Sequence, residues 1–302
     1  MFKKVVIALI AAAALVATGL ASWWLVQQYR PGPELLAAAK SEPPLVLTAK
    51  YSAGNLRQLS PDAPEWKLAT PVEIPLTFQV LAIPWGRSDK GPLTARALHN
   101  NKRLYIRLEW SDATENRHTV RIEELPDACA VMFPLEATQP SSLMMGFLGR
   151  VNIWHWKANW DAQYWATGSD SPAAADIYPF DDDPVFYPAR AVGNLRAATA
   201  LPSAVEDLLS DGPGSITTKD RQSVAGRGWW REGRWQVVFA RALGTEGPDD
   251  FQFNPGSETR MAFAVWDGGR GEKGSRKSIS EWTTLALQPI APAPMTAQRR
   301  ER

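Results

Sequence analysis

Apolar and polar residues alternate along several short stretches of the chain, and Gly, Pro, Asp and Asn separate these stretches. A period of two is typical of β-strands that bury one face. Strands are therefore predicted at Leu76–Ala82, Leu104–Trp110, Trp235–Phe239, Met261–Trp266 and Trp282–Ala286. Cys129–Phe133 is a short unbroken apolar run, which predicts a fully buried strand. Together these patterns predict an all-β fold, an antiparallel β-sandwich with long loops and few short helices.

A helical pattern stands out at one place in the body of the chain. Ser203-x-x-Glu206 has the form of a capping box, and Leu208-Leu209 and Gly212 follow it. This order of residues predicts a short helix that begins after Ser203. The segment 166–200 is rich in Pro, Ala and Asp with weak periodicity, and it predicts a long insertion over a sheet face.

The N-terminal segment has the pattern of a membrane-spanning helix. Val5–Val26 is a run of 22 residues without a charge, long enough to cross a bilayer. Lys3-Lys4 precede the run and Trp23-Trp24 lie near its far end, which favours export of the body. A cleaved signal peptide, with Gly19-Leu20-Ala21 as the cleavage site, is the alternative. Both interpretations place residues from 31 onward on the periplasmic, extracytoplasmic side, and the retained anchor is favoured.

The chain is expected to divide into four parts. These are an anchor or signal peptide (1–30), a linker and lead-in segment (31–69), the β-sandwich domain (70–290) and a tail (291–302).

Composition excludes several classes of protein. The 302 residues carry a net charge of +1, and the basic residues at the two ends leave the body slightly acidic, so no nucleic-acid partner is expected. The single cysteine excludes an internal disulfide, a Cys-x-x-Cys metal site and covalent haem attachment through Cys-x-x-Cys-His. Three histidines without metal-ligand spacing and the absence of Gly-x-Ser-x-Gly leave little support for a hydrolase.

Three motifs have plain structural interpretations. Gly269–Gly274 matches G-x-G-x-x-G, but a strand pattern follows it rather than a helix, so a strand-to-strand loop is expected instead of a nucleotide site. Asp181–Asp183 lacks the ligand spacing of a calcium loop and predicts a solvated acidic loop, with a weak cation site left open. Trp229-Trp230 and Trp235 flank a predicted hairpin turn at Arg231–Arg234.

The segment from Met132 to Trp160 combines methionines with dense aromatic residues. Leu143–Gly146 contains two adjacent methionines, and Val151–Trp160 contains three of the chain's 14 tryptophans. Core packing explains such residues. The alternative is a thioether ligand in a dry aromatic pocket, which haem iron can use.

Two signatures in this order resemble a known family. Asp127–Pro134, Met145-Gly146 and Val151–Ala158 form the first, and Met261–Gly269 with Arg276–Trp282 form the second. They resemble the haem-binding γ subunits of ethylbenzene and dimethylsulfide dehydrogenases and of selenate and chlorate reductases. The resemblance covers roughly residues 70–288.

The resemblance implies a β-sandwich that holds one non-covalent haem b with a Met and a Lys as axial ligands. Carried over, the ligands are Met145 and Lys277, with Met144 and Lys273 as the second choices. Aromatic residues are expected to wall the haem pocket, and the candidates are Trp154, Trp156, Trp266 and Trp282.

The same resemblance implies a non-catalytic, cytochrome b-type electron-transfer subunit. Its partners would be a molybdopterin catalytic subunit, an iron–sulfur subunit and an external carrier such as a cytochrome c, with the membrane reached through the N-terminal helix. Segment 166–200 and loop 268–274 are the candidate docking surfaces. The alternatives are an exported carbohydrate-binding β-sandwich module and a structural subunit without a cofactor.

Overall fold

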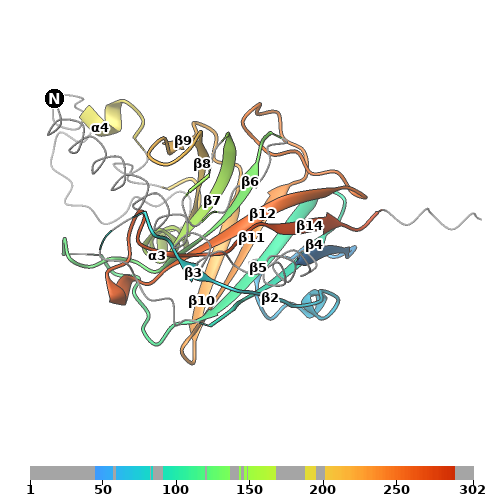
Figure 1. Cartoon of the computed structure of the whole chain (residues 1–302), viewed down its shortest axis with the longest axis horizontal. Coiled ribbons are helices and arrows are strands. Elements are labelled where there is room, and N and C mark those ends of the chain that lie inside the picture. Colours follow the sequence, from blue (N-terminus) through green and yellow to red (C-terminus); the bar gives the residue numbers. More distant parts are fainter. Residues whose placement is uncertain are drawn as a thin grey trace, which may run out of the picture. The chain divides into compact units, whose positions relative to one another are not determined.

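Fourteen strands and a few short helices make up the part of the chain that the structure describes (Figure 1). The computed structural model describes residues 45–289, apart from 57–58, 82, 84–90, 120, 137–142, 144–145, 148, 168–187 and 195–200. The strands are β1 (Val46–Tyr51), β2 (Val72–Ile74), β3 (Thr77–Phe78), β4 (Leu93–His99), β5 (Arg103–Ser111), β6 (Ala128–Pro134), β7 (Val151–Lys157), β8 (Val205–Ser210), β9 (Thr217–Thr218), β10 (Ala225–Arg231), β11 (Arg234–Ala242), β12 (Glu258–Trp266), β13 (Ser278–Ile279) and β14 (Thr283–Leu287). The helices are α3 (Ala158–Thr167), α4 (Pro188–Ala191) and the 3₁₀ turns η2 (Pro64–Lys67) and η5 (Gly268–Arg270).

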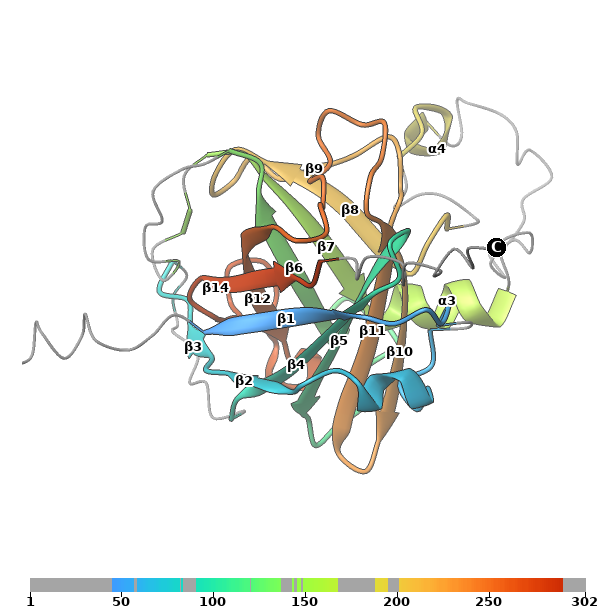
Figure 2. The same cartoon turned by 90° about the vertical axis from the view of Figure 1, so that its right-hand side faces the viewer.

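Hydrogen bonds connect most of the strands in the order β10-β11-β5-β4-β1-β14-β12-β6-β7-β8-β9. The order divides at β12 into two halves: β10-β11-β5-β4-β1-β14 and β6-β7-β8-β9. Strand β12 belongs to both, because Glu258–Met261 pair with β14 and Ala262–Trp266 pair with β6. The prediction of an antiparallel sandwich is correct except at β1, which runs parallel to both β4 and β14 (Figure 2). Long chain segments rather than hairpins connect β1 to these neighbours, so nothing enforces the antiparallel direction there.

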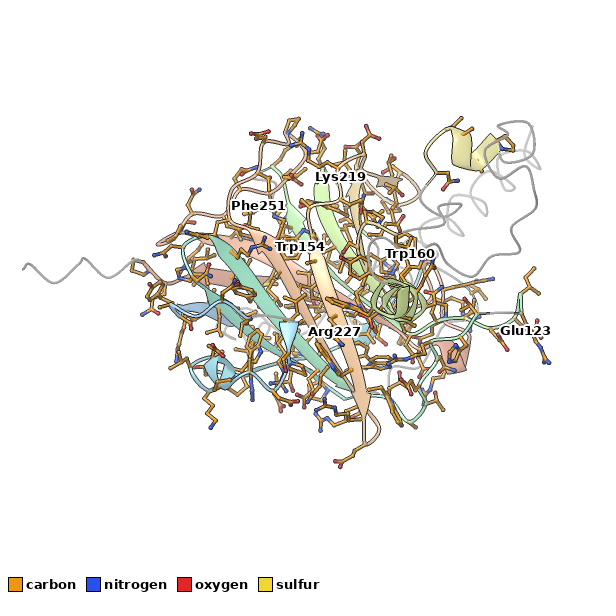
Figure 3. All side chains as sticks on the ribbon, turned by 180° about the vertical axis from the view of Figure 1, so that it is seen from behind. Glu123, Trp154, Trp160, Lys219, Arg227 and Phe251 are labelled. Carbon is orange, nitrogen blue, oxygen red and sulfur yellow. The ribbon has the colours of Figure 1, made fainter. Side chains whose placement is uncertain are left out.

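The main core lies between the two halves. Its centre is aromatic: the Trp156 ring of β7 lies 5.0 Å from Trp235 of β11 and 6.4 Å from Trp110 of β5, measured between ring centroids. The ring of Trp154 in β7 lies 6.4 Å from that of Phe239 in β11, again between centroids. These contacts join strands from opposite halves, so the fold is a β-sandwich closed over aromatic side chains (Figure 3).

Period-two alternation placed several strands correctly. Strand β5 buries Leu104, Ile106, Leu108 and Trp110, and β6 contains the buried run that starts at Cys129. The Trp229-Trp230 hairpin is confirmed: β10 and β11 pair through a turn at Glu232-Gly233, both with positive φ. The Gly269–Gly274 loop is also confirmed as a connection that leads to the short strand β13.

The predicted helix after Ser203 is wrong, because this segment forms strand β8. The Ser203 hydroxyl donates to the backbone oxygen of Val224 and accepts from the backbone N–H of Val205, so it does not cap a helix. Val205–Ser210 pair instead with β7 over six residues. Tertiary pairing therefore overrides the local capping signal.

Two further local predictions need correction, and one helix was not predicted. The strand predicted over Leu76–Ala82 is reduced to β3, two residues long, in the described residues. In β14 the buried positions are Thr283, Leu285 and Leu287, the opposite phase from Trp282–Ala286. Helix α3 was not predicted at all, because its sequence has almost no helical amphipathicity and its position depends on Asp161, which bonds to the core.

The lead-in segment contributes to the fold. Its strand β1 lies in the middle of the strand order, and Leu56, Leu59 and Trp66 form a second apolar cluster over β4, β5 and β11. Among the described residues no helix is long and apolar enough to cross a membrane. The candidate anchor 5–26, the acidic run Asp181–Asp183, the tail 291–302 and most of segment 166–200 lie outside the described residues.

Asp161 of α3 ties the core aromatic cluster to the β10 backbone. Its Oδ1 atom accepts from Trp156 Nε1 (2.9 Å) and from the backbone N–H of Gly228 (2.8 Å). Burial raises the pKa of Asp161 to about 6, although both hydrogen bonds lower it. Because the folded pKa lies above the unfolded one, this carboxyl stabilises the fold at low pH and loses that contribution as pH rises through about 6.

We expect Asp161→Asn to stabilise the protein at neutral pH, since the amide oxygen still accepts both hydrogen bonds without a buried charge. The difference in free energy of unfolding between variant and wild type should grow by about 2–3 kcal/mol from pH 4 to pH 6 and then stay level. Asp161→Ala should cost about 1–3 kcal/mol for each donor left unsatisfied. Urea denaturation across this pH range measures both; parallel curves for wild type and Asp161→Asn would contradict the assignment.

Candidate functional site

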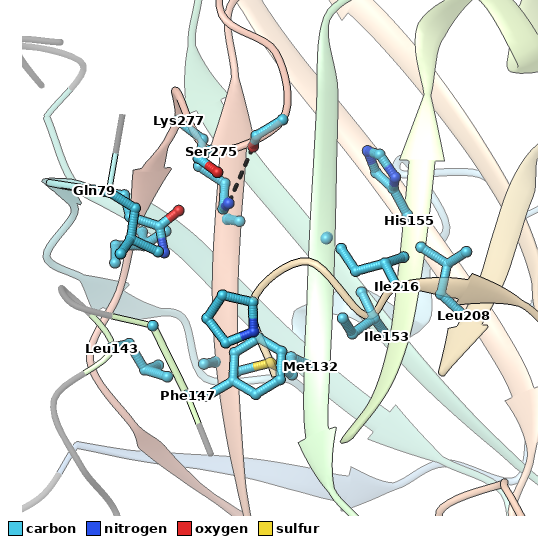
Figure 4. A pocket seen from close by; sticks show the side chains of 18 of the residues that line it. Gln79, Met132, Leu143, Phe147, Ile153, His155, Leu208, Ile216, Ser275 and Lys277 are labelled. Atoms are coloured by element: carbon cyan, nitrogen blue, oxygen red, sulfur yellow. Dashed lines mark hydrogen bonds between the residues drawn. The ribbon is translucent and has the colours of Figure 1, made fainter. Parts of the chain in front are cut away.

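A cavity of about 480 Å³ lies on the face of β12, β6, β7 and β8 that points away from the main core (Figure 4). Alternation along these strands creates the two faces. In β7, Asn152, Trp154 and Trp156 are buried on the core side, whereas Ile153 and His155 line the cavity. A volume of this size is within the usual range for small-molecule and cofactor sites.

The floor of the cavity includes three alanines on two neighbouring strands, Ala130 of β6 and Ala262 and Ala264 of β12. Ala130 of β6 lies beside Ala264 of β12, and Ala262 lies beside Met132 in the same pairing. Ala130 also pairs with His155 and Met132 with Ile153 of β7. These three short side chains leave the sheet surface low over β6 and β12, which gives room for a flat molecule.

The walls come from loops that are distant in sequence. Leu143, Gly146 and Phe147 precede β7, Gly212–Gly214 and Ile216 follow β8, and Gln79 and Leu81 follow β3. Most of these side chains are apolar, so burying an apolar ligand against them is favourable.

Polar groups gather at one end of the lining. Glu206 is buried, pairs with Lys157 in a salt bridge and accepts a hydrogen bond from Thr218 Oγ1 at 2.6 Å. His155 is opposite Glu206 in the β7–β8 pairing, and its ring lies against Trp266 with 4.8 Å between centroids and 35° between the ring planes. The carboxylate of Glu206 in the wall is therefore neutralised by Lys157, which lies behind it and lines a second, smaller cavity.

Lys277 is the one lysine or arginine among the described residues that line this cavity, and no carboxylate contributes to its pKa shift. It is half-buried, and its Nζ atom donates to the backbone oxygen of Gly274 at 3.1 Å (Figure 4). Burial lowers the pKa of Lys277 to about 8, because no neighbouring negative charge offsets the desolvation. A substantial fraction of this amine is neutral just above neutral pH, so it has a lone pair to donate to a metal.

These features fit the haem that the family resemblance implied. The three alanines leave room for a flat apolar group, and the Lys277 amine, with its lowered pKa, would be available to ligate the iron of a haem bound there. The described residues on either side of Met144-Met145, namely Leu143, Gly146 and Phe147, line the same cavity. Met144 and Met145 themselves lie outside the described residues.

The aromatic residues expected around a cofactor are divided between two places. Trp266 lines the cavity. Trp154 and Trp156 are fully buried in the main core, on the opposite face of β7. Trp282 packs on the small apolar cluster around Ile279.

Lys273, the second choice for the lysine ligand, is exposed. It lines a second cavity of about 380 Å³ that shares His155, Trp266 and Gly274 with the first.

Sequence reasoning missed the alanine floor, Met132, His155 and Glu206 as lining residues. The signal was present in the alternation: once Trp154 and Trp156 face the core, His155 must face the other way. Glu206 was hidden because its segment was assigned to a helix rather than to β8.

A buried acidic cluster lies beside the loop that carries Lys277. Asp127 accepts from the backbone N–H groups of Asn116 (2.7 Å) and Gly268 (2.9 Å) and from Trp235 Nε1 (2.9 Å). Burial and the neighbouring Asp112 raise the pKa of Asp127 to about 7. The carboxylates of Asp112, Asp127 and Asp267 lie within 4.8 Å of one another. The hydrogen bonds of Asp127 fix the start of the 268–277 loop against the core.

Comparison with protein families identifies a match over most of this domain. The model of the family described as ethylbenzene dehydrogenase matches residues 63–278. That range contains every described residue of the cavity floor and Lys277.

Three named relatives are a little over a quarter identical to this chain over the segments that align. A protein named "putative respiratory nitrate reductase heme subunit" from Haloferax mediterranei is 27% identical over 78% of this chain and 69% of its own length. The γ subunit of dimethylsulfide dehydrogenase from Rhodovulum sulfidophilum is 28% identical over 67% of this chain and 63% of its own length. The γ subunit of chlorate reductase from Ideonella dechloratans is 27% identical over 75% of this chain and 78% of its own length.

Among solved structures, a family 9 carbohydrate-binding module from Caldicellulosiruptor kristjanssonii in complex with cellotriose gives a TM-score of 0.42 at 7% identity. The match covers 83% of this chain and 98% of the module. A likeness this distant carries no inference about what this chain binds.

Proposed function

This chain belongs to the ethylbenzene dehydrogenase family, and from that premise we propose that it is a haem-binding electron-transfer subunit of an oxidoreductase complex. The observation that carries the proposal is the position of Lys277: a half-buried amine of lowered pKa at a hollow apolar sheet face. The named relatives support it, since one is a haem subunit and two are γ subunits of oxidoreductases.

Lys277 and Met145 would hold one non-covalent haem b through its iron. Bound there, haem supplies reversible one-electron chemistry at iron. The chain's own residues provide the surroundings: the alanine floor admits the ring, and the apolar walls exclude water. Burial shifts the Lys277 amine toward its neutral form before any ligand binds, so less free energy is needed to remove its proton. A thioether from Met145 would favour the ferrous state.

The subunit is proposed to relay electrons and not to catalyse turnover. Two side-chain ligands would leave no open iron position for a substrate. The partners would be a molybdopterin catalytic subunit, an iron–sulfur subunit and an external carrier such as a cytochrome c. We also propose that residues 5–26 anchor the chain, with the domain on the periplasmic side.

Carbohydrate binding has less support. Sugars bind to exposed aromatic side chains. In the described part of the chain, Trp165 is the one tryptophan that is exposed. The guanidinium of Arg227 lies 4.4 Å from its ring centroid, so Trp165 is partly covered.

We expect the purified full chain to bind about one protohaem per molecule, extractable as the pyridine haemochrome. Ala264→Leu should abolish this binding, because the larger side chain occupies the cavity floor, whereas it leaves the core face of β12 unchanged. Circular dichroism checks that the variant is folded. Well-folded wild-type protein that stays colourless when haem is supplied would refute the cofactor assignment.

The two ligands can be tested separately. Lys277→Ala should shift the low-spin spectrum of the haem, and Met145→Ala should lower its reduction potential, since a soft ligand of ferrous iron is lost. Lys273→Ala and Met144→Ala are the matched controls and should preserve both properties. If Met144→Ala or Lys273→Ala changes the spectrum and the variant of the assigned ligand does not, the residue replaced in that control is the ligand instead.

The relay itself predicts fast haem redox chemistry in the complex. Native membranes washed with high salt should retain the chain, and detergent extraction should co-purify larger molybdenum and iron–sulfur subunits. In stopped-flow mixing with the substrate of the catalytic subunit, haem absorbance should change at least as fast as overall turnover. Haem changes that lag behind turnover would exclude a relay, and release of the chain by salt would exclude the anchor.

A further inference from the structure

One backbone carbonyl joins Trp266 to Lys277. The oxygen of Gly274 accepts a hydrogen bond from Trp266 Nε1 at 3.0 Å and another from Lys277 Nζ at 3.1 Å. Nζ also lies 5.2 Å from the centroid of the Trp266 ring. The indole and the amine are therefore coupled through one acceptor.

The Gly274 peptide has few other contacts. Gly274 has a φ of +58°, and a methyl group added to it would meet no described atom within 4 Å. Residues Lys273–Ser275 are exposed. With so little packing, two hydrogen bonds hold this loop: Arg276 N–H donates to the Lys273 carbonyl oxygen at 3.0 Å and closes the turn around Gly274, and the Trp266 indole N–H holds the Gly274 carbonyl itself.

Trp266 is itself well fixed. It is the last residue of β12 and pairs with Ala128 of β6, and its ring lies against the ring of His155 at 4.8 Å between centroids. The backbone of Lys277 is fixed on the other side, because its carbonyl oxygen accepts from Gln79 N at 3.1 Å and β13 begins at the next residue. Only the Lys277 side chain is left to be oriented across the loop.

We propose that Trp266 is a positioning residue for Lys277: by holding the Gly274 carbonyl, it directs the amine into the cavity. The inference rests on the proposed haem function. A coordinating amine keeps two N–H groups, and donating one to Gly274 fixes its rotamer and increases its basicity as a ligand, as outer hydrogen bonds do for other metal ligands. Trp266 thus acts through the loop and not only as an apolar wall.

The test is Trp266→Phe, which keeps the aromatic ring and removes the indole N–H. Its matched control is Trp230→Phe, which removes an indole hydrogen bond of the same 3.0 Å length, to the Asp112 carbonyl oxygen, outside the cavity lining. In the haem-loaded full chain, Trp266→Phe should convert part of the ferric haem from low spin to high spin. Added n-butylamine should restore the low-spin spectrum, while wild type and Trp230→Phe should stay low-spin without it.

Hydrogen exchange in the haem-free chain gives a second measurement. In Trp266→Phe the amides of 273–277 should exchange about three- to tenfold faster, the loss expected for one hydrogen bond, with the other strands unchanged. A wild-type haem spectrum in Trp266→Phe would overturn the inference, whatever the exchange shows. Wild-type protein that binds no haem would refute the proposed function instead, and unchanged exchange at 273–277 would then overturn the positioning role as well.

If Trp266→Phe does not fold, Gly274→Ala moves the same carbonyl without touching the indole. Its methyl group meets no atom, but the left-handed backbone at φ +58° becomes strained. The same high-spin shift and amine rescue are expected, and an unchanged spectrum would overturn the proposal.

Discussion

The packing of Trp156 across the sandwich is the contact on which the rest of the structure depends. Its ring fills the space over β10 so closely that a methyl group at Gly228 would lie 2.2 Å from it. Its indole N–H is bonded to Asp161, which also binds the Gly228 backbone. One side chain therefore fixes the two halves of the fold, the start of α3 and the position of β10 at the same time.

This packing also decides which side chains can form the cavity. Because Trp154 and Trp156 point into the core, Ile153 and His155 must point out, and the neighbouring strands follow the same phase through their register. The core face takes the large rings, and the outer face takes the alanines at 130, 262 and 264. A rigid, densely packed sheet thus supports a hollow on its other side, where the geometry of a ligand can be held precisely.

The electrostatics of the cavity follow from the same division. Glu206 in the wall is neutralised by Lys157 behind it, and Asp127 accepts hydrogen bonds from three donors beneath the loop. Lys277 is left without a carboxylate among the described residues, so burial alone lowers the pKa of its amine. A lysine in this condition costs stability as a cation and is suited to donate a lone pair, which is why it marks a functional site.

The sequence by itself determined the all-β class, the strands around Leu104–Trp110 and Met261–Trp266, and the two segments that meet at the cavity, because alternation and motifs are local properties. It did not determine that Ser203–Ser210 pairs as a strand, that β1 runs parallel to its neighbours, or that Trp156 belongs to the core and Trp266 to the cavity. Each of these depends on which strand lies alongside and in which register. The alternation shows which residues share a face with a given tryptophan, but it does not show which of the two faces is turned to the core. That is decided by the element that packs on one face and buries it.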